Sequence, residues 1–119
     1  MPHLTLEYTA NLPIAAKELL LKINAALVAS SHFQEVDIKS RALRFEDFAI
    51  GTADNGRAFV HAKLAILKGR TTEVKRALSE SVLAVIQDAG AWPAGLDVQL
   101  CVEILELERE TYAKAHFQS

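Results

Sequence analysis

The sequence predicts an α+β fold in which two β-α-β units share one four-stranded mixed sheet, with both helices on the same face of that sheet. Two observations support this prediction. Apolar residues alternate with polar ones in four segments and recur every three to four positions in two others. The order strand, helix, strand therefore occurs twice, over about residues 2–45 and 58–107. A helical crossover makes the two strands of each unit parallel.

The first unit is predicted to open with a strand over Pro2–Thr9, where apolar and polar positions alternate. Asn11-Leu12-Pro13 ends that strand. A helix follows over Ala15–Ser30, and its apolar stripe consists of Leu19, Ile23, Ala26 and Leu27. Alternation returns over Val36–Phe45, which predicts the second strand with Val36 and Ile38 on the face that meets the helix.

A connector over Glu46–Arg57 separates the two units. It has few periodic apolar positions and contains Asn55-Gly56, a strong turn signal, so we expect a hairpin here. The second unit then begins with a strand over Ala58–Leu67.

The second predicted helix has the most regular apolar stripe in the chain. Thr71 or Thr72 can cap its N-terminus, and Gly90 followed by Pro93 ends it. Alternation over Leu96–Leu107 predicts the last strand, whereas residues 108–119 are polar and carry no predicted element.

The length and charge of the chain limit its class. With 119 residues, half of them apolar, residues 1–119 have the size of a single domain. Thirteen Lys and Arg against fifteen Asp and Glu give a net charge of −2, which argues against a nucleic-acid-binding protein. The sequence has no secretory signal, no apolar segment of membrane length and no Cys or His cluster with metal spacing. We therefore expect a cytoplasmic protein that binds neither a membrane nor a metal.

The sheet face opposite the helices is predicted to mix polar and apolar side chains. Its polar members are His3, Glu7, Lys39, Arg41, His61, Lys63, Gln99 and Glu103. No further element remains in the sequence to cover this face, which favours self-association into an oligomer.

Pro2 is the first candidate for chemistry. Removal of the initiator Met before a small second residue would leave a free secondary amine on the first strand. An apolar pocket and nearby cations disfavour the charged form of an amine and lower its pKa toward neutral pH, where it can act as a general base. The alternative is that the Met-Pro start reflects Met excision alone.

Three cations are candidates for binding an anion. Arg70 lies in a turn between a strand and a helix N-terminus, where a guanidinium and unpaired N–H groups suit a carboxylate. Lys39 and Arg41 lie two residues apart on one strand face and could hold a second carboxylate. The alternatives are a solvated turn arginine for Arg70, and ion pairs with Glu7 or Glu103 for the other two.

Taken together, four segments resemble the 5-carboxymethyl-2-hydroxymuconate isomerase family of the tautomerase superfamily, to which 4-oxalocrotonate tautomerase also belongs. The resemblance extends over about residues 2–107, and the combination is specific although no single segment is. The four segments are Pro2–Tyr8, Ile38–Ala42, Ala58–Leu64 and Lys68–Glu73.

The resemblance implies a tautomerase fold, a homotrimer and no cofactor. It implies that Pro2 shuttles a proton within a dienol or unsaturated keto acid, while Arg70 and a basic residue of the second strand bind the carboxylates of this small molecule. The family commonly has Arg-Ser-Arg on that strand. This chain has Lys39-Ser40-Arg41, so Arg41 is retained, whereas Lys39 keeps the charge without the bidentate fork.

The tail also departs from the family pattern. The family often ends with an Asn-Asn-x-His segment, whereas this chain reads Tyr112-Ala113-Lys114-Ala115-His116. We therefore expect the edges of a pocket built from the tail to differ from those of the family.

Residues and resemblance together predict an isomerase that moves a proton in an unsaturated 2-hydroxy or 2-keto polycarboxylic acid. The best single candidate is 5-carboxymethyl-2-hydroxymuconate, a product of aromatic-compound catabolism. Two alternatives stay open. One keeps the N-terminal proline but changes the reaction to hydration, dehalogenation or decarboxylation, and the other is a non-catalytic oligomeric binding protein.

Overall fold

A computed structural model describes residues 1–90 and 92–118 of the chain. Ser119, the last residue of the predicted domain, therefore lies outside the described residues. Two 3₁₀ turns, Glu35–Asp37 and Arg109–Thr111, accompany the main elements. In chain order, the strands and α-helices are β1 (His3–Thr9), α1 (Ala16–Ala29), β2 (Lys39–Phe45), β3 (Arg57–Leu67), α2 (Thr72–Ala89) and β4 (Asp97–Leu107).

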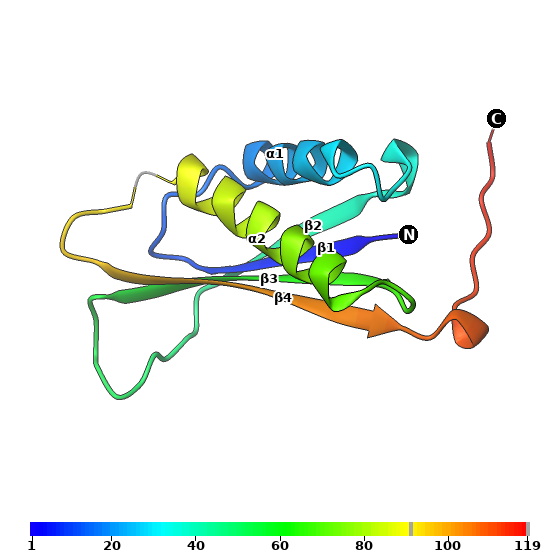
Figure 1. The fold of residues 1–119 in the computed structure, drawn as a ribbon. Coiled ribbons are helices and arrows are strands. Elements are labelled where there is room, and N and C mark those ends of the chain that lie inside the picture. Colours follow the sequence, from blue (N-terminus) through cyan, green and yellow to red (C-terminus); the bar gives the residue numbers. More distant parts are fainter. Residues whose placement is uncertain (91, 119) are drawn as a thin grey trace.

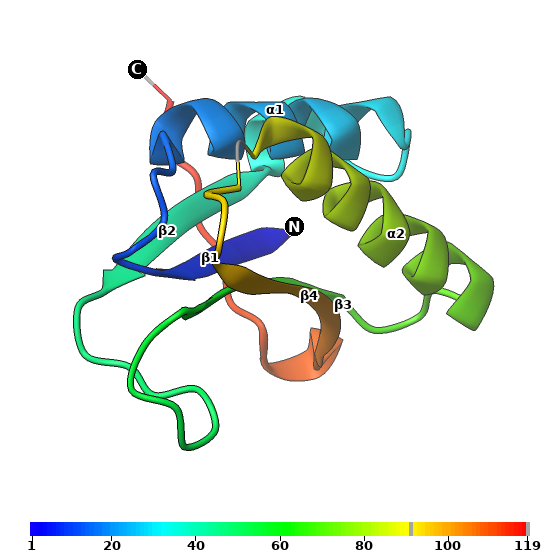
Figure 2. The ribbon, with the colours of Figure 1, turned by 90° about the vertical axis from the view of Figure 1, so that its left-hand side faces the viewer.

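The four strands form one mixed sheet in the order β2-β1-β3-β4. Each β-α-β unit contributes a parallel pair, β1 with β2 and β3 with β4, and the antiparallel pairing of β1 with β3 joins the units at the centre. Both helices pack on the same face of the sheet (Figures 1 and 2). The predicted fold class is therefore confirmed.

A single apolar layer between the sheet and the helices holds the two units together. On each helix the buried residues recur at every fourth position, because one face of each amphipathic helix meets the sheet. The fully or nearly fully buried core includes Leu4, Leu6, Leu19, Ile23, Leu27, Val60, Ala62, Leu64, Leu78, Val82 and Ile86. Both units contribute to this one core, so neither has a separate apolar interior.

Two details of the prediction are wrong. The second strand was expected to begin at Val36, but Glu35–Asp37 forms a 3₁₀ turn and Val36 is 65% exposed, because the strand pairing with β1 begins only at Lys39. The connector over Glu46–Arg57 was expected to be a hairpin. It contains turns, but it does not join neighbouring strands, since β1 lies between β2 and β3.

The face of the sheet opposite the helices is covered by no helix of the described residues (Figure 1). The strand register places His3 beside Lys39 and Thr5 beside Arg41 on this face. Apolar side chains share it, including the exposed Leu43 and Leu105. Within the described residues, no helix is both long and apolar enough to cross a membrane.

Candidate active site

Pro2 lies at the N-terminal end of β1 and its side chain is fully buried. Its carbonyl oxygen accepts a hydrogen bond from the backbone N–H of Lys39 at 3.2 Å, which fixes the start of β1 against the start of β2. The Pro2 nitrogen forms a peptide bond with Met1 in this chain. The residue is therefore held rigidly, and its nitrogen becomes an amine only when Met1 is removed.

Lys39 lies against the same end of the sheet. Its ammonium donates to the carbonyl oxygen of Asp37 at 2.7 Å and lies 3.9 Å from the Met1 sulfur. Asp37 is the last residue of the 3₁₀ turn that precedes β2, and its carbonyl oxygen faces this ammonium. Lys39 is thereby placed beside the N-terminus.

Cations from three separate segments act on the terminal amine. Burial lowers the pKa of the Met1 α-ammonium below its ordinary value, and the charges of Lys39, Lys114 and Arg70 lower it further, while Asp37 opposes them. The fold therefore creates an environment at the N-terminus that favours a neutral amine, which is the condition required of a basic nitrogen near neutral pH.

Arg70 lies in the turn between β3 and α2 and faces the loop that follows α1. One terminal nitrogen of its guanidinium lies 3.2 Å from His32 Nδ1, and the other donates to the His32 carbonyl oxygen at 3.0 Å. The guanidinium carbon is 4.9 Å from the centre of the Phe33 ring, a cation–π distance. These contacts use two of the five N–H donors of an arginine, so the described contacts leave three for a ligand.

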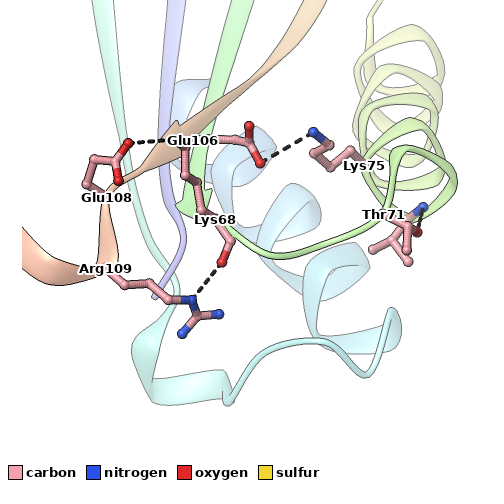
Figure 3. A network of polar contacts seen from close by, with 7 residues as sticks. Lys68, Thr71, Lys75, Glu106, Glu108 and Arg109 are labelled. Carbon is pink, nitrogen blue, oxygen red and sulfur yellow. Dashed lines mark hydrogen bonds and ion pairs between the residues drawn. The ribbon is translucent and has the colours of Figure 1, made fainter.

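The turn that carries Arg70 is fastened to the end of β4 (Figure 3). Arg109 Nε donates to the Lys68 carbonyl oxygen at 2.7 Å, and the Lys68 ammonium pairs with Glu108. Gly69 has a φ of +123°, a conformation that side-chain-bearing residues rarely adopt. Thr71 then caps α2 by accepting the N–H of residue 74 at 3.2 Å, as the sequence predicted. The position of Arg70 is thus set by backbone geometry on both sides.

Arg41 occupies a different part of the site. One of its terminal nitrogens lies 3.1 Å from His3 Nδ1, and His3 Nε2 lies 2.8 Å from the Tyr112 hydroxyl. Because a guanidinium only donates, Nδ1 must accept and the ring proton must sit on Nε2. Burial lowers the pKa of His3, and the charges of Arg41 and Lys39 add to this effect, which agrees with a neutral ring.

The alternative ion pairs with Glu7 and Glu103 are not found for either cation of β2 in the described residues. Glu7 instead pairs with Lys63 at 3.4 Å, and Glu103 pairs with His61 at 2.8 Å. Lys39 and Arg41 therefore direct their charges toward the N-terminal end of β1 rather than toward the middle of the sheet.

Sequence reasoning missed the contribution of the tail and of the turn before β2. Tyr112 contacts His3, and the ammonium of Lys114 lies 2.8 Å from Asp37 Oδ1. This ion pair lowers the pKa of Asp37. Residues 112–118 form no regular element, so no periodicity could have identified them. The only signal was the departure of the tail from the family pattern.

The candidate site therefore lies at one end of the sheet and is lined by positively charged side chains. Pro2, Lys39 and Arg70 lie around the terminal amine, whereas Arg41 reaches the site through its contact with His3. The part of the chain that the structure describes contains no group of three or more His, Cys, Asp or Glu side chains close enough to hold a metal ion.

Comparisons with known proteins identify the family and the fold of this chain. Residues 2–117 match the family model described as 5-carboxymethyl-2-hydroxymuconate isomerase. The chain is 37% identical to a solved 5-carboxymethyl-2-hydroxymuconate isomerase from Deinococcus radiodurans R1, with 98% of this chain and 90% of that chain covered and a TM-score of 0.87. Comparison with the curated proteins finds no significant match.

More distant solved structures share the fold. A 5-carboxymethyl-2-hydroxymuconate delta-isomerase is 20% identical, with 99% of this chain and 89% of that chain covered and a TM-score of 0.80. A fused 4-OT symmetric trimer is 21% identical, with 98% and 94% covered and a TM-score of 0.76. The match over nearly the whole chain, together with the 37% identity to a solved member, shows that this chain belongs to the 5-carboxymethyl-2-hydroxymuconate isomerase family and is an isomerase of the tautomerase type.

Proposed function

We propose that this isomerase moves a proton within an unsaturated 2-hydroxy or 2-keto polycarboxylic acid, with 5-carboxymethyl-2-hydroxymuconate as its substrate. The observation that carries the proposal is the convergence of the charges of Lys39, Arg70 and Lys114 on a partly buried N-terminus. A substrate with several carboxylates matches a site with several cations. The 37% identical isomerase from Deinococcus radiodurans R1 supports the same substrate.

In this mechanism, Met1 is removed and the nitrogen of Pro2 becomes the base. The neutral imino nitrogen takes a proton from one position of the dienol or keto acid, the double bonds shift, and the protonated nitrogen returns the proton to another carbon. Substrate and product contain the same atoms, so the reaction consumes no co-reactant. The imino nitrogen ends each cycle neutral.

The cations have two effects in this mechanism. They hold the substrate through its carboxylates, and their positive charge stabilises the negative charge that develops on the enol oxygen and carboxylate system. Arg70 is suited to a bidentate contact because three of its N–H donors remain after its contacts with His32. The same charges disfavour protonation of Pro2, which keeps the base ready near neutral pH.

The proposal includes a homotrimer. The sheet face opposite the helices carries exposed apolar residues such as Leu43 and Leu105 beside charged ones, and a second copy of the chain would remove them from water. The fused 4-OT relative is described as a symmetric trimer. Sedimentation equilibrium tests this directly, since a trimer has three times the mass of the 13.1 kDa chain.

The test of the mechanism compares three forms of the enzyme. Mass spectrometry first establishes whether Met1 is absent. The rate of 5-carboxymethyl-2-hydroxymuconate isomerisation is then followed by ultraviolet absorbance for the wild type, Pro2→Ala and a form with one alanine inserted before Pro2. We expect both altered forms to lose a factor of about 10² to 10⁴, the typical contribution of a positioned base.

The matched control is Lys22→Ala, which removes an exposed lysine of α1 outside the site. It should retain the wild-type rate. Full activity of the alanine-extended form would exclude the Pro2 nitrogen as the base. A panel of related acids separates isomerisation from hydration, dehalogenation and decarboxylation, because only isomerisation leaves the mass of the product unchanged.

A further inference from the structure

The C-terminal tail crosses the end of the sheet where the N-terminus lies (Figure 1). Two residues, separated by one position, fasten it there. Tyr112 contacts His3 from β1, and Lys114 contacts Asp37 from the turn before β2. The tail thus adds side chains to a site whose other members come from the β-α-β units.

The Lys114 ammonium is positioned for a ligand as well as for its ion pair. Its side chain is 32% exposed and that of Asp37 is 25% exposed, so both can be reached from solvent. An ammonium has three N–H donors, and the contact with Asp37 Oδ1 at 2.8 Å uses one. The backbone carbonyl oxygen of Asp37 also accepts a hydrogen bond from the Lys39 ammonium at 2.7 Å, so both ammonium groups contact the same residue.

The balance of charges around Asp37 indicates which kind of ligand the two lysines can bind together. Lys39, Arg41, Arg70 and Lys114 carry four positive charges, and the Asp37 carboxylate pairs with Lys114, whereas Lys39 contacts the backbone carbonyl of Asp37. An excess of cations favours a ligand with more than one negative charge. 5-Carboxymethyl-2-hydroxymuconate has three carboxylates, one more than 2-hydroxymuconate, which lacks the carboxymethyl arm.

We propose that Lys114 is a specificity-determining residue that binds the additional carboxylate of a tricarboxylic substrate, and that Asp37 is the anion that pairs with its ammonium when no substrate is bound. This inference rests on the proposed function and deepens it. Without substrate, the ion pair holds the ammonium at the edge of the site and reduces its repulsion with Lys39. With substrate, the remaining N–H donors of Lys114 bind the carboxymethyl carboxylate.

A purely structural role for the ion pair predicts a different result. If Lys114 and Asp37 only fastened the tail, then Lys114→Ala and Asp37→Asn would break the same contact and have the same effect. If Lys114 binds a carboxylate, the two changes have different effects on KM, and only Lys114→Ala raises it. Lys114→Ala removes a cation from the ligand, whereas Asp37→Asn removes a competing anion.

The experiment measures KM and kcat for 5-carboxymethyl-2-hydroxymuconate and for 2-hydroxymuconate with each variant. We expect Lys114→Ala to raise KM for the tricarboxylate about tenfold and KM for the dicarboxylate less than twofold, consistent with the loss of one exposed charge-assisted contact. Lys114→Arg should restore most of the preference, and Asp37→Asn should lower KM or leave it unchanged. Lys22→Ala is the control for loss of one lysine charge.

Two results would overturn the inference. One is an equal change in KM for both acids in Lys114→Ala, and the other is the same loss in Asp37→Asn as in Lys114→Ala. Since Lys114 is partly exposed, folding of its variants is checked by circular dichroism, and Lys114→Met provides a second variant that removes the charge but keeps an unbranched side chain of similar length.

Calorimetric binding of the two acids to Pro2→Ala separates this inference from the proposed function. One outcome is that the wild type isomerises neither acid, but Pro2→Ala binds the tricarboxylate more tightly than the dicarboxylate and loses this preference when Lys114→Ala is added. In that case the proposed function fails and the inference stands. If the wild type isomerises both acids and Lys114→Ala leaves the preference intact, only the inference fails.

Discussion

Arg70→Ala tests the assignment of the strongest carboxylate-binding group. The guanidinium contacts His32 through two N–H donors, which leaves three for substrate in the described contacts. A bidentate contact uses two of them, and charge-assisted hydrogen bonds contribute about 1.5–3 kcal/mol each. Because the side chain is half-buried, we take the lower end, about 3 kcal/mol in total, which corresponds to a loss of about 10²-fold in kcat/KM.

The same substitution removes contacts that stabilise the fold, so the two effects must be separated. The cation–π contact with Phe33 is worth about 0.5–1 kcal/mol at an exposed site. Phe33→Leu removes this contact but leaves the guanidinium in place, and it is the matched control. Arg70→Lys keeps the charge but loses the fork, so we expect an intermediate loss of about tenfold.

The assay follows kcat/KM by ultraviolet absorbance and the free energy of unfolding by urea denaturation for all three variants. We expect Phe33→Leu to lose stability with kcat/KM within about threefold of the wild type. A wild-type kcat/KM for Arg70→Ala would refute the assignment, and so would a loss in Phe33→Leu as large as that in Arg70→Ala.

Four further predictions follow from contacts described above. Lys39→Ala removes a cation beside the N-terminus, so the Pro2 nitrogen of the proposed mechanism should be protonated more readily and the acid limb of the kcat/KM profile should move to higher pH; an unchanged or lower limb would contradict this. Because the pKa of His3 is lowered by folding, the unfolded chain binds more protons below pH about 6.5, and the free energy of unfolding falls as the pH drops through that window toward the native pKa. His3→Gln should make that fall shallower in urea titrations at successive pH values, and an identical slope would count against it. Thr71→Ala should cost about 1 kcal/mol of stability through loss of the helix cap, and no change in the urea midpoint would exclude that cap. Leu78→Ala, at a position 2% exposed in the core, should cost about 2–5 kcal/mol in the same assay, and a cost below about 1 kcal/mol would indicate a core that collapses around the gap.

The elements of this fold were predictable because each has a regular local pattern. The strict alternation in β1 and β3 matches the alternating burial of these strands, and the apolar stripe of α2 gives its buried Leu78, Val82 and Ile86. Where the pattern and the pairing disagreed, the pairing decided. Val36 continues the alternation of β2, but it lies before the first residue that β1 can pair with, so it remains exposed.

The site was predictable only where a residue type carries its chemistry with it. A proline after the initiator Met, an arginine at a strand-to-helix turn and two basic residues on one strand face were recognisable as Pro2, Arg70, Lys39 and Arg41. Their roles remain proposals. The partners of these residues were not predictable, because contacts such as Arg70 with His32 and Arg41 with His3 join segments separated by 38 positions.

By itself, the sequence determined the two β-α-β units, their shared core and the residue types available for acid–base and carboxylate chemistry, because these depend on periodicity and on the identity of side chains. Only the tertiary structure decided which charges meet. It placed Lys114 of an irregular tail against Asp37 of a turn, 77 positions away, and it joined the two units through antiparallel pairing rather than through a hairpin. Both outcomes depend on the path of the chain in space, which has no periodic signature in the sequence.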